Sequence, residues 1–177
     1  MAFGTGTHET TRGVMEMLER HWPPTLSGPG ASASLLDVGT GTGILSFAAA
    51  RLTDAAAHSQ LSQRFPVVAC DLDPDAIRVA SENAEINGLQ DRIEFHVSSV
   101  EKFSGHNFDM VLANLTSDVI IAIAADLCGA VGASGKLIVS GILLDQLSGV
   151  LAGLEPHGLR ELERKPDGEW VSVVMVR

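Results

Sequence analysis

The chain has 177 residues, of which 45% are hydrophobic and 19% are charged, a balance typical of one globular domain and not of an intrinsically disordered chain. Its formal net charge of −10 argues against direct nucleic-acid binding, because phosphates require a basic surface. No apolar run is long enough to cross a membrane, and no signal-peptide pattern is present. Two cysteines, Cys70 and Cys128, are too few for a disulfide framework. We therefore expect a cytoplasmic protein with two buried thiols and no membrane partner.

The N-terminal part of the chain precedes the first predicted strand. Residues 1–10 are rich in glycine and threonine and predict a loop, whereas apolar residues at helical spacing predict a helix from about Thr11 to Arg20. Residues 21–34 are rich in proline, glycine and serine, which is typical of a linker. We expect residues 1–34 to pack on a core made by residues 35–177.

Apolar strands then alternate with helical patterns. The predicted strands are Leu35–Val38, Val67–Asp71, Ile93–Val97, Met110–Asn114, Leu137–Ser140, Leu159–Arg164 and Trp170–Val176. The predicted helices are Ile44–Leu52, Asp75–Asn87, Ser117–Val131 and Asp145–Leu154. This order predicts an α/β fold with a doubly wound, mostly parallel seven-stranded sheet. The last two strands are separated only by a Pro-Asp-Gly turn and predict an antiparallel C-terminal hairpin, while polar residues 53–64 predict a surface insertion.

A glycine-rich loop follows the first predicted strand and precedes a predicted helix. It reads Asp37-Val38-Gly39-Thr40-Gly41-Thr42-Gly43. Glycines let the backbone turn sharply and approach a ligand closely, and the helix N-terminus presents unpaired N–H groups. Ile44 stands where a dinucleotide-binding fingerprint has its third glycine, which weakens a nicotinamide or flavin interpretation. The loop therefore predicts a ligand site of another kind.

An aspartate closes the second predicted strand. Asp71 lies at the carboxyl end of that strand, where an acid can accept hydrogen bonds from ribose hydroxyls. The alternative is that Asp71 or Asp73 only caps the next helix; we expect Asp73 to be that cap and Asp71 to be the ribose acceptor. Together, the glycine loop and Asp71 indicate a nucleoside-containing cofactor.

Further motifs resemble the bacterial PrmA family, which methylates large-subunit ribosomal protein 11. They are the opening AFGTGTHETT, the segment Ala113-Asn114-Leu115, the run Ser140-Gly141-Ile142-Leu143 and the GEW near the C-terminus. The similarity extends over nearly all of residues 2–177. It implies a Rossmann-like class I methyltransferase fold with S-adenosyl-L-methionine as cofactor.

The resemblance also implies site residues. Matching motifs carry four cofactor contacts to this chain, and the other two glycines of the loop complete the predicted site: Thr11, Gly39, Gly41, Gly43, Asp71 and Asn114. Thr11 can place a hydroxyl beside the methionine end of the cofactor. Asn114 is also the predicted catalytic residue, because cofactor and target amine can both reach the end of the fourth strand.

The chain departs from the family at two places. Family members carry a further N-terminal domain that recognises the ribosomal protein, and we expect it to be absent because Met1 adjoins the opening motif. The family asparagine is usually followed by Ile-Leu-Ala, whereas this chain has Leu115-Thr116-Ser117. The resemblance itself implies N-methylation of a lysine or α-amine on a basic protein, with large-subunit ribosomal protein 11 as the candidate. The alternatives are a cofactor-binding remnant without activity and a small-molecule methyltransferase.

Other polar residues receive plainer interpretations. His8-Glu9 begins like a zinc motif, but Arg12 stands where the second histidine would be, so no metal site is predicted. His8 either lines the entrance of the methionine pocket or has a structural role in its loop. Glu161 and Glu163 alternate on a predicted edge strand and are interpreted as solvated surface. The chain has no tyrosine to stack on a flipped nucleobase, and nothing in the sequence predicts an oligomeric state.

Overall fold

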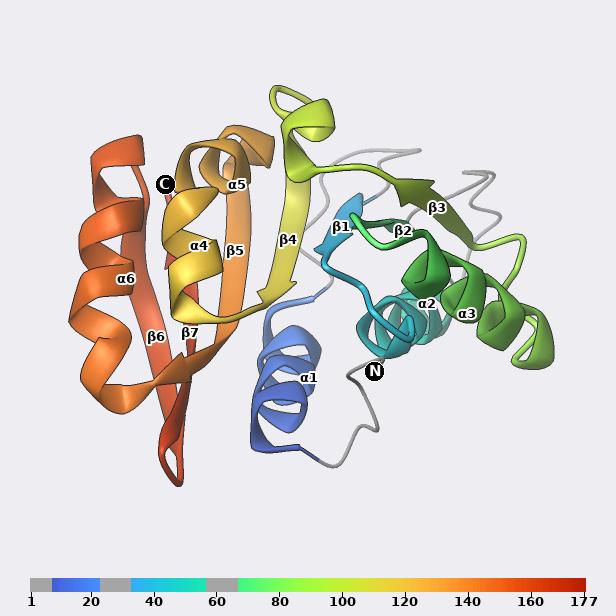
Figure 1. Cartoon of the computed structure of the whole chain (residues 1–177), viewed down its shortest axis with the longest axis horizontal. Helices are drawn as coiled ribbons and strands as arrows, with labels where there is room; N and C mark the ends of the chain where they lie inside the picture. The colour runs from blue at the N-terminus through green and yellow to red at the C-terminus, as the bar shows by residue number, and fades with distance from the viewer. Residues whose placement is uncertain (1–7, 23–32, 57–66) are drawn as a thin grey trace.

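The computed structural model describes residues 8–22, 33–56 and 67–177. Their centre is a seven-stranded sheet in the order β3-β2-β1-β4-β5-β7-β6 (Figure 1). The strands are β1 Leu35–Val38, β2 Val67–Asp71, β3 Ile93–Val97, β4 Phe108–Asn114, β5 Val131–Leu143, β6 Arg160–Asp167 and β7 Trp170–Val176. The pairs among β1 to β5 are parallel, and β7 runs antiparallel to both β5 and β6. The predicted doubly wound sheet and its C-terminal hairpin are confirmed.

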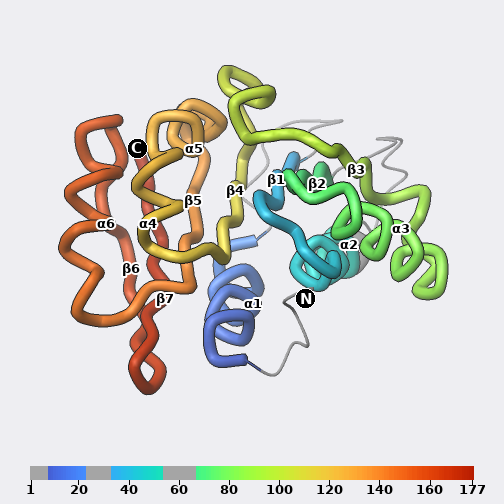
Figure 2. Tube along the Cα trace, in the orientation of Figure 1, coloured from blue at the N-terminus to red at the C-terminus, as the bar shows by residue number. Residues whose placement is uncertain are grey.

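Helices cover both faces of the sheet (Figure 2). They are α1 Glu9–His21, α2 Ile44–Ala56, α3 Pro74–Ile86, α4 Ser117–Ala122, α5 Ala124–Ala130 and α6 Leu147–Leu154, with 3-10 turns η1 Val100–Phe103, η2 Leu144–Gln146 and η3 Glu155–His157. One buried cluster joins the sheet to α1, α2 and α3, and a second joins it to α4, α5 and α6. None of the described helices is long and apolar enough to span a membrane.

One predicted helix is two helices in the structure. The prediction of a continuous helix over Ser117–Val131 is wrong, because Ile123 leaves helical geometry with φ −109° and ψ 16°. Helix α4 packs against α6. A Cβ added at Gly153 of α6 would lie 3.5 Å from Cγ1 of Ile121 of α4. Helix α5 packs against η1 and η3 in addition to α6. The break lets the two helices meet different neighbours, and periodicity along the chain does not contain that information.

Other boundaries also differ from the prediction, including the start of α1 at Glu9 inside the predicted loop, and the two largest differences are at the start of β5 and the end of α2. Strand β5 begins at Val131 and not at Leu137, because Val131 pairs with Phe108 before a bulge, and the ladder resumes at Lys136. Helix α2 continues to Ala56, so the start of the predicted insertion is helical, as expected of a segment with good helix formers. Residues 57–64 of that insertion, residues 23–32 of the predicted linker and residues 1–7 of the predicted loop lie outside the described residues.

Helix α1 is joined to the edge strand β6 by a ladder of ion pairs. Residues at helical spacing on α1 face alternate residues of β6, and the charges alternate in sign along both elements. The pairs are Arg12 with Asp167, Glu16 with Lys165 and Arg20 with Glu163. His21 adds a contact from its Nε2 to the Oε2 of Glu163 at 2.8 Å. The interpretation of Glu163 as solvated surface is therefore wrong, since this side chain is paired with α1. Among the described residues, Glu161 pairs with Arg164 of its own strand.

Reversing one charge in this ladder tests how much its ion pairs contribute to the free energy of unfolding. Glu163→Lys places a cation against Arg20 and His21, and we expect the free energy of unfolding to fall by about 1 kcal/mol, as for a partly exposed pair turned repulsive. Urea unfolding at low and high salt measures the change, and salt should reduce it. Glu169→Lys, at an exposed acid between β6 and β7, is the control and should cost less. Equal, salt-independent losses in both variants would contradict the ladder.

Candidate functional site

Three strands end side by side at one edge of the sheet. Val38 at the end of β1 pairs in register with Cys70 on β2 and with Ala113 on β4. The residues that follow these three, Gly39, Asp71 and Asn114, therefore emerge at the same edge. Strands β2 and β4 lie on opposite sides of β1, so the chain order reverses here. In open α/β sheets, such a reversal leaves a crevice in which ligands bind.

The predicted glycine loop lies at this switch point and is tied to the second strand. Gly39, Gly41 and Gly43 have φ values of +71°, +57° and +88°, which residues with side chains rarely adopt. The Gly39 N–H donates to the Cys70 carbonyl at 2.8 Å. A Cβ at Gly39 would lie 2.5 Å from Cδ2 of Leu115. Glycine is therefore required by the backbone conformation, and a side chain here would also displace Leu115.

Both oxygens of Asp71 hold backbone groups of the site. Oδ2 accepts from the Gly41 N–H and Oδ1 from the Asp73 N–H, each at 3.0 Å. A carboxylate oxygen has two lone pairs, so each can accept one further hydrogen bond. Asp73 caps α3 by accepting from the Asp75 N–H at 2.9 Å, which confirms the predicted cap and separates its role from that of Asp71.

Residues beside Asp71 extend the site in a way that sequence reasoning missed. Val97 pairs in register with Asp71, and the Ser98 N–H donates to the Asp71 carbonyl at 2.9 Å. The Oγ of Ser98 is buried and has no hydrogen-bond partner within the described structure. Leu72 and Val97 are unusually exposed for aliphatic side chains, at 74% and 55%. A planar ligand ring could pack on these apolar side chains while a polar atom at its edge forms a hydrogen bond with the Ser98 hydroxyl. The signal in the sequence is only that these residues follow predicted strands.

A buried carboxylate supports the glycine loop from below. Asp37 is 1% exposed, and its Oδ2 accepts from the hydroxyls of Thr40 at 2.7 Å and Ser46 at 2.6 Å. Burial raises the pKa of Asp37, and the hydrogen bonds from Ser46 and Thr40 oppose that shift. The side chain thereby links strand β1, the loop and helix α2. The sequence places Asp37 at the start of the loop motif but does not indicate this role.

Helix α1 brings its first turn to the end of β4. Thr11 is buried, and its Oγ1 accepts from Nδ2 of the half-buried Asn114 at 3.4 Å. This contact leaves the Asn114 carbonyl oxygen available as an acceptor. The two predicted site residues are therefore adjacent, although they are 103 positions apart in the chain.

His8 has the structural role that was one of its two interpretations. Its Nδ1 accepts from the Thr10 N–H at 3.3 Å and so caps α1. Its ring meets the edge of Trp170, with centroids 5.3 Å apart. Within residues 8–22, 33–56 and 67–177, no group of three or more histidine, cysteine, aspartate and glutamate side chains is arranged to hold a metal ion.

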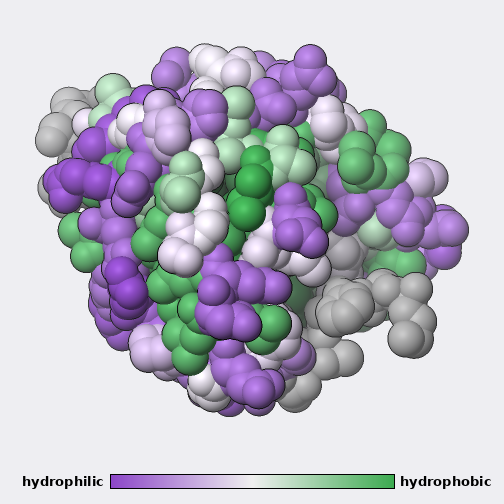
Figure 3. All heavy atoms as spheres, turned by 60° about the vertical axis from the view of Figure 1, so that its left-hand side comes forward, coloured by the Kyte–Doolittle hydropathy of each residue, from purple (hydrophilic) through white to green (hydrophobic). Residues whose placement is uncertain are grey.

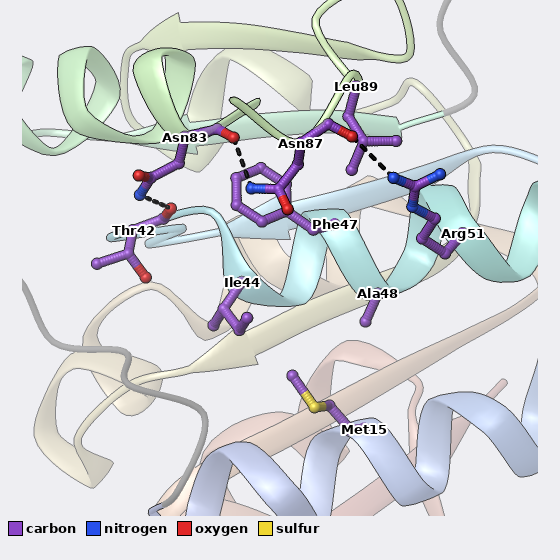
Figure 4. A pocket seen from close by; sticks show the side chains of 9 residues that line it. All are labelled: Met15, Thr42, Ile44, Phe47, Ala48, Arg51, Asn83, Asn87 and Leu89. Atoms are coloured by element: carbon purple, nitrogen blue, oxygen red, sulfur yellow. Dashed lines mark hydrogen bonds between the residues drawn. The ribbon is translucent and has the colours of Figure 1, made fainter. Parts of the chain in front are cut away.

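A surface groove of about 440 Å³ lies behind the glycine loop, between α1, α2 and α3 (Figure 4). Of the predicted loop it includes only Thr42, and it contains none of the predicted site residues. Its polar groups bond to one another: Asn83 donates to the Thr42 carbonyl at 3.1 Å, and Arg51 donates to the Asn87 carbonyl at 2.7 Å. We therefore assign the candidate site to the strand ends and not to this groove.

The two cysteines are buried free thiols, as predicted. Burial raises the pKa of Cys70 to about 12 and that of Cys128 to about 11. Both side chains are therefore protonated at neutral pH, and since the thiolate is the nucleophilic form, they act as core residues.

The glycine loop, the acid after β2 and the polar end of β4 at a switch point define a class I methyltransferase domain. The family model described as "Ribosomal protein L11 methyltransferase (PrmA)" matches residues 1–177, and the chain belongs to this family. Ribosomal protein L11 methyltransferases of Geotalea daltonii and Geobacter metallireducens are 39% and 41% identical, each over 96% of this chain. The chain spans 52% and 50% of their lengths.

A solved structure shows the same fold. The crystal structure of ribosomal protein L11 methylase from Lactobacillus delbrueckii subsp. bulgaricus superposes with a TM-score of 0.81 at 27% identity, covering 100% of this chain and 81% of that one. An O-methyltransferase from Thermotoga maritima shares the fold at 14% identity, with a TM-score of 0.69.

The buried carboxylate predicts a pH-dependent stability. The pKa of Asp37 in the folded chain lies above the ordinary 3.8, so the folded chain holds this proton more tightly than the unfolded chain. Stability should therefore fall as pH rises from the ordinary pKa through the raised one. Asp37→Asn does not titrate at this position, so its stability should not fall across this pH interval. The free energy of unfolding of the variant minus that of the wild type should therefore increase with pH. Urea unfolding at a series of pH values measures the difference.

Ser46→Ala provides the matched comparison for this prediction. Loss of its hydrogen bond should raise the pKa of Asp37 further and extend the pH interval upward. A difference between Asp37→Asn and the wild type that stays constant with pH would show that the carboxylate has the same pKa in the folded and unfolded chains.

Proposed function

We propose that the chain is the catalytic domain of an S-adenosyl-L-methionine-dependent protein N-methyltransferase. The observation that carries the proposal is the register that brings Gly39, Asp71 and Asn114 to one edge of the sheet. The proposed substrate is a lysine or α-amine of ribosomal protein L11, and the names of the relatives support it. A ribosomal substrate and two free thiols also support a cytoplasmic location.

The residues at the strand ends suit the parts of this cofactor. The free lone pairs of Asp71 would accept from the ribose hydroxyls, and Leu72, Val97 and Ser98 would meet the adenine ring. Gly39, Gly41 and Gly43 would let the backbone approach the methionine portion, whose carboxylate suits the helix N-terminus that follows. Thr11 would contact the same end. In this arrangement helix α1 would contribute one side of a site whose other residues lie at the ends of β1, β2 and β4.

The main contribution of this chain to the reaction would be to align the target nitrogen with the methyl group. When bound, the cofactor supplies a methyl group that its positively charged sulfur already activates. Asn114 would accept an N–H of the target amine through its side-chain carbonyl, while its own N–H remains on Thr11. Holding the nitrogen about 3–3.5 Å from the methyl carbon removes several kcal/mol of entropic barrier.

The target amine must also lose a proton before it attacks. A free lysine has a pKa near 10.4, and transfer from water into the half-buried site would lower that value. Bulk water would take the released proton. Asp118, an exposed acidic side chain in the first turn of the helix that follows β4, would favour the approach of a cationic segment.

Removal of Asp71 tests the cofactor site. Asp71→Ala should weaken S-adenosyl-L-methionine binding by roughly 1–3 kcal/mol, the usual loss for hydrogen bonds to a charged acceptor. Isothermal titration calorimetry measures the dissociation constant. The neighbouring Asp73→Ala removes only the cap of α3 and should lower stability while leaving the affinity nearly unchanged. Equal dissociation constants for Asp71→Ala and Asp73→Ala would show that the Asp71 side chain does not bind the cofactor.

Methyl transfer from labelled cofactor to purified ribosomal protein L11 tests the reaction. The chain spans about half the length of its relatives, so it is assayed alone and behind the N-terminal half of the Geotalea daltonii enzyme. We expect slow transfer alone and faster transfer in the fusion, because remote contacts position the acceptor. Asn114→Ala should lower the rate of transfer more than cofactor affinity.

The same assay separates the alternatives. Label that enters only small molecules of a bacterial extract would favour a small-molecule methyltransferase. Cofactor binding without transfer to any acceptor, in the chain or the fusion, would favour a binding domain without activity.

A further inference from the structure

Two serines lie in the apolar interior of the sheet beneath helix α1. Ser140 on β5 is 0% exposed and Ser172 on β7 is 3% exposed, and their hydroxyl oxygens are 2.7 Å apart. Ser172 is the one polar residue between Val171 and Val176 of its strand. Burying hydroxyls there carries a free-energy cost, and aliphatic β-branched residues would suit these positions better. The pair therefore calls for an explanation beyond strand formation.

The serine pair is in close contact with the first turns of α1. The Ser140 hydroxyl donates to the backbone carbonyl of Thr10 at 3.2 Å. An added Cβ at Gly13 would lie 2.3 Å from the Oγ of Ser172. Glycine is unfavourable inside a helix, but here it lets the helix rest directly on the serine hydroxyl. The contact explains the serine and the glycine together.

Ser140 is also bonded to the end of β4. Its backbone pairs in register with Asn114, and its carbonyl accepts from the Leu115 N–H at 3.0 Å. Its side chain holds Thr10, which directly precedes Thr11. One buried residue is thus attached to both chain segments that meet where the Asn114 amide donates to the Thr11 hydroxyl.

We propose that Ser140 and Ser172 are positioning residues, which set the first turn of α1 so that the Thr11 hydroxyl stays against Asn114. The pair does not touch the proposed cofactor or substrate; it acts through Thr10 and the β5 backbone. Its effect on binding rests on the function proposed above, whereas its effect on the Thr11–Asn114 contact does not. The competing explanation is that the serines only pack the helix onto the sheet.

The test compares Ser140→Ala and Ser172→Ala with Val173→Ala. Val173 adjoins Ser172 but is buried on the opposite face of the sheet, in the cluster formed with α4, α5 and α6. The first measurement is the ¹⁵N NMR spectrum of the cofactor-free chain. Loss of either serine hydroxyl should shift the Asn114 side-chain amide and Thr11 backbone resonances, and Val173→Ala should not. Each serine variant removes the hydrogen bond between the Ser140 and Ser172 hydroxyls. The test can therefore be read even if only one of the two variants folds.

The second measurement is the dissociation constant of S-adenosyl-L-methionine for the same samples, below their melting temperatures. We expect it to rise about fivefold to tenfold in the serine variants, as for a lost hydrogen bond, and to stay unchanged in Val173→Ala although that variant is less stable. Unmoved Asn114 and Thr11 resonances in both serine variants would overturn the proposal, as would an equal loss of affinity in Val173→Ala. If the wild type binds no cofactor, the proposed function fails, and the NMR result still decides the positioning role.

Discussion

The pairing of β1 between β2 and β4 is the constraint on which the site depends. Because Val38, Cys70 and Ala113 lie in register, the next residue of each strand emerges at the same edge. A slip of one residue in either pair would turn a side chain to the opposite face of the sheet. The apolar residues on both faces of these strands make such a slip costly, so the core packing also holds Gly39, Asp71 and Asn114 together.

Helix α1 belongs to the site because two kinds of interaction hold it on the sheet. On its exposed side, ion pairs with β6 set the position of the helix along the edge strand. On its buried side, the hydroxyls of Ser140 and Ser172 meet the first turn and Gly13. Partly exposed ion pairs are weak and sensitive to salt, whereas buried hydrogen bonds are short-range and directional. The two sets therefore hold the same helix, which carries Thr11, by complementary means. The face turned forward in Figure 3 mixes hydrophobic and hydrophilic side chains, without separating them into two regions.

The carboxylates beneath and beside the glycine loop stabilise a conformation that the backbone would not adopt freely. Asp37 is buried at a cost that its hydrogen bonds only partly offset, and Asp71 uses one lone pair of each oxygen on backbone N–H groups. Polar groups of this kind reduce the conformational freedom of the loop before a ligand arrives, which lowers the entropy lost on binding. Departures from an apolar core are expected at functional sites.

The sequence by itself determined the alternation of strands and helices, the C-terminal hairpin, the glycine loop and Asp71 as its neighbour, because hydrophobic period and turn residues are local signals. It also led to the family, through the opening motif, the segments Ala113-Asn114-Leu115 and Ser140–Leu143, and the GEW near the C-terminus. The break at Ile123, the bulge that moves the start of β5 to Val131, the pairing of Glu163 with α1 and the buried network of Asp37 were decided only by the tertiary structure. Each depends on contacts between segments far apart in the chain, whose geometry is set when helices and strands pack and which no local pattern encodes.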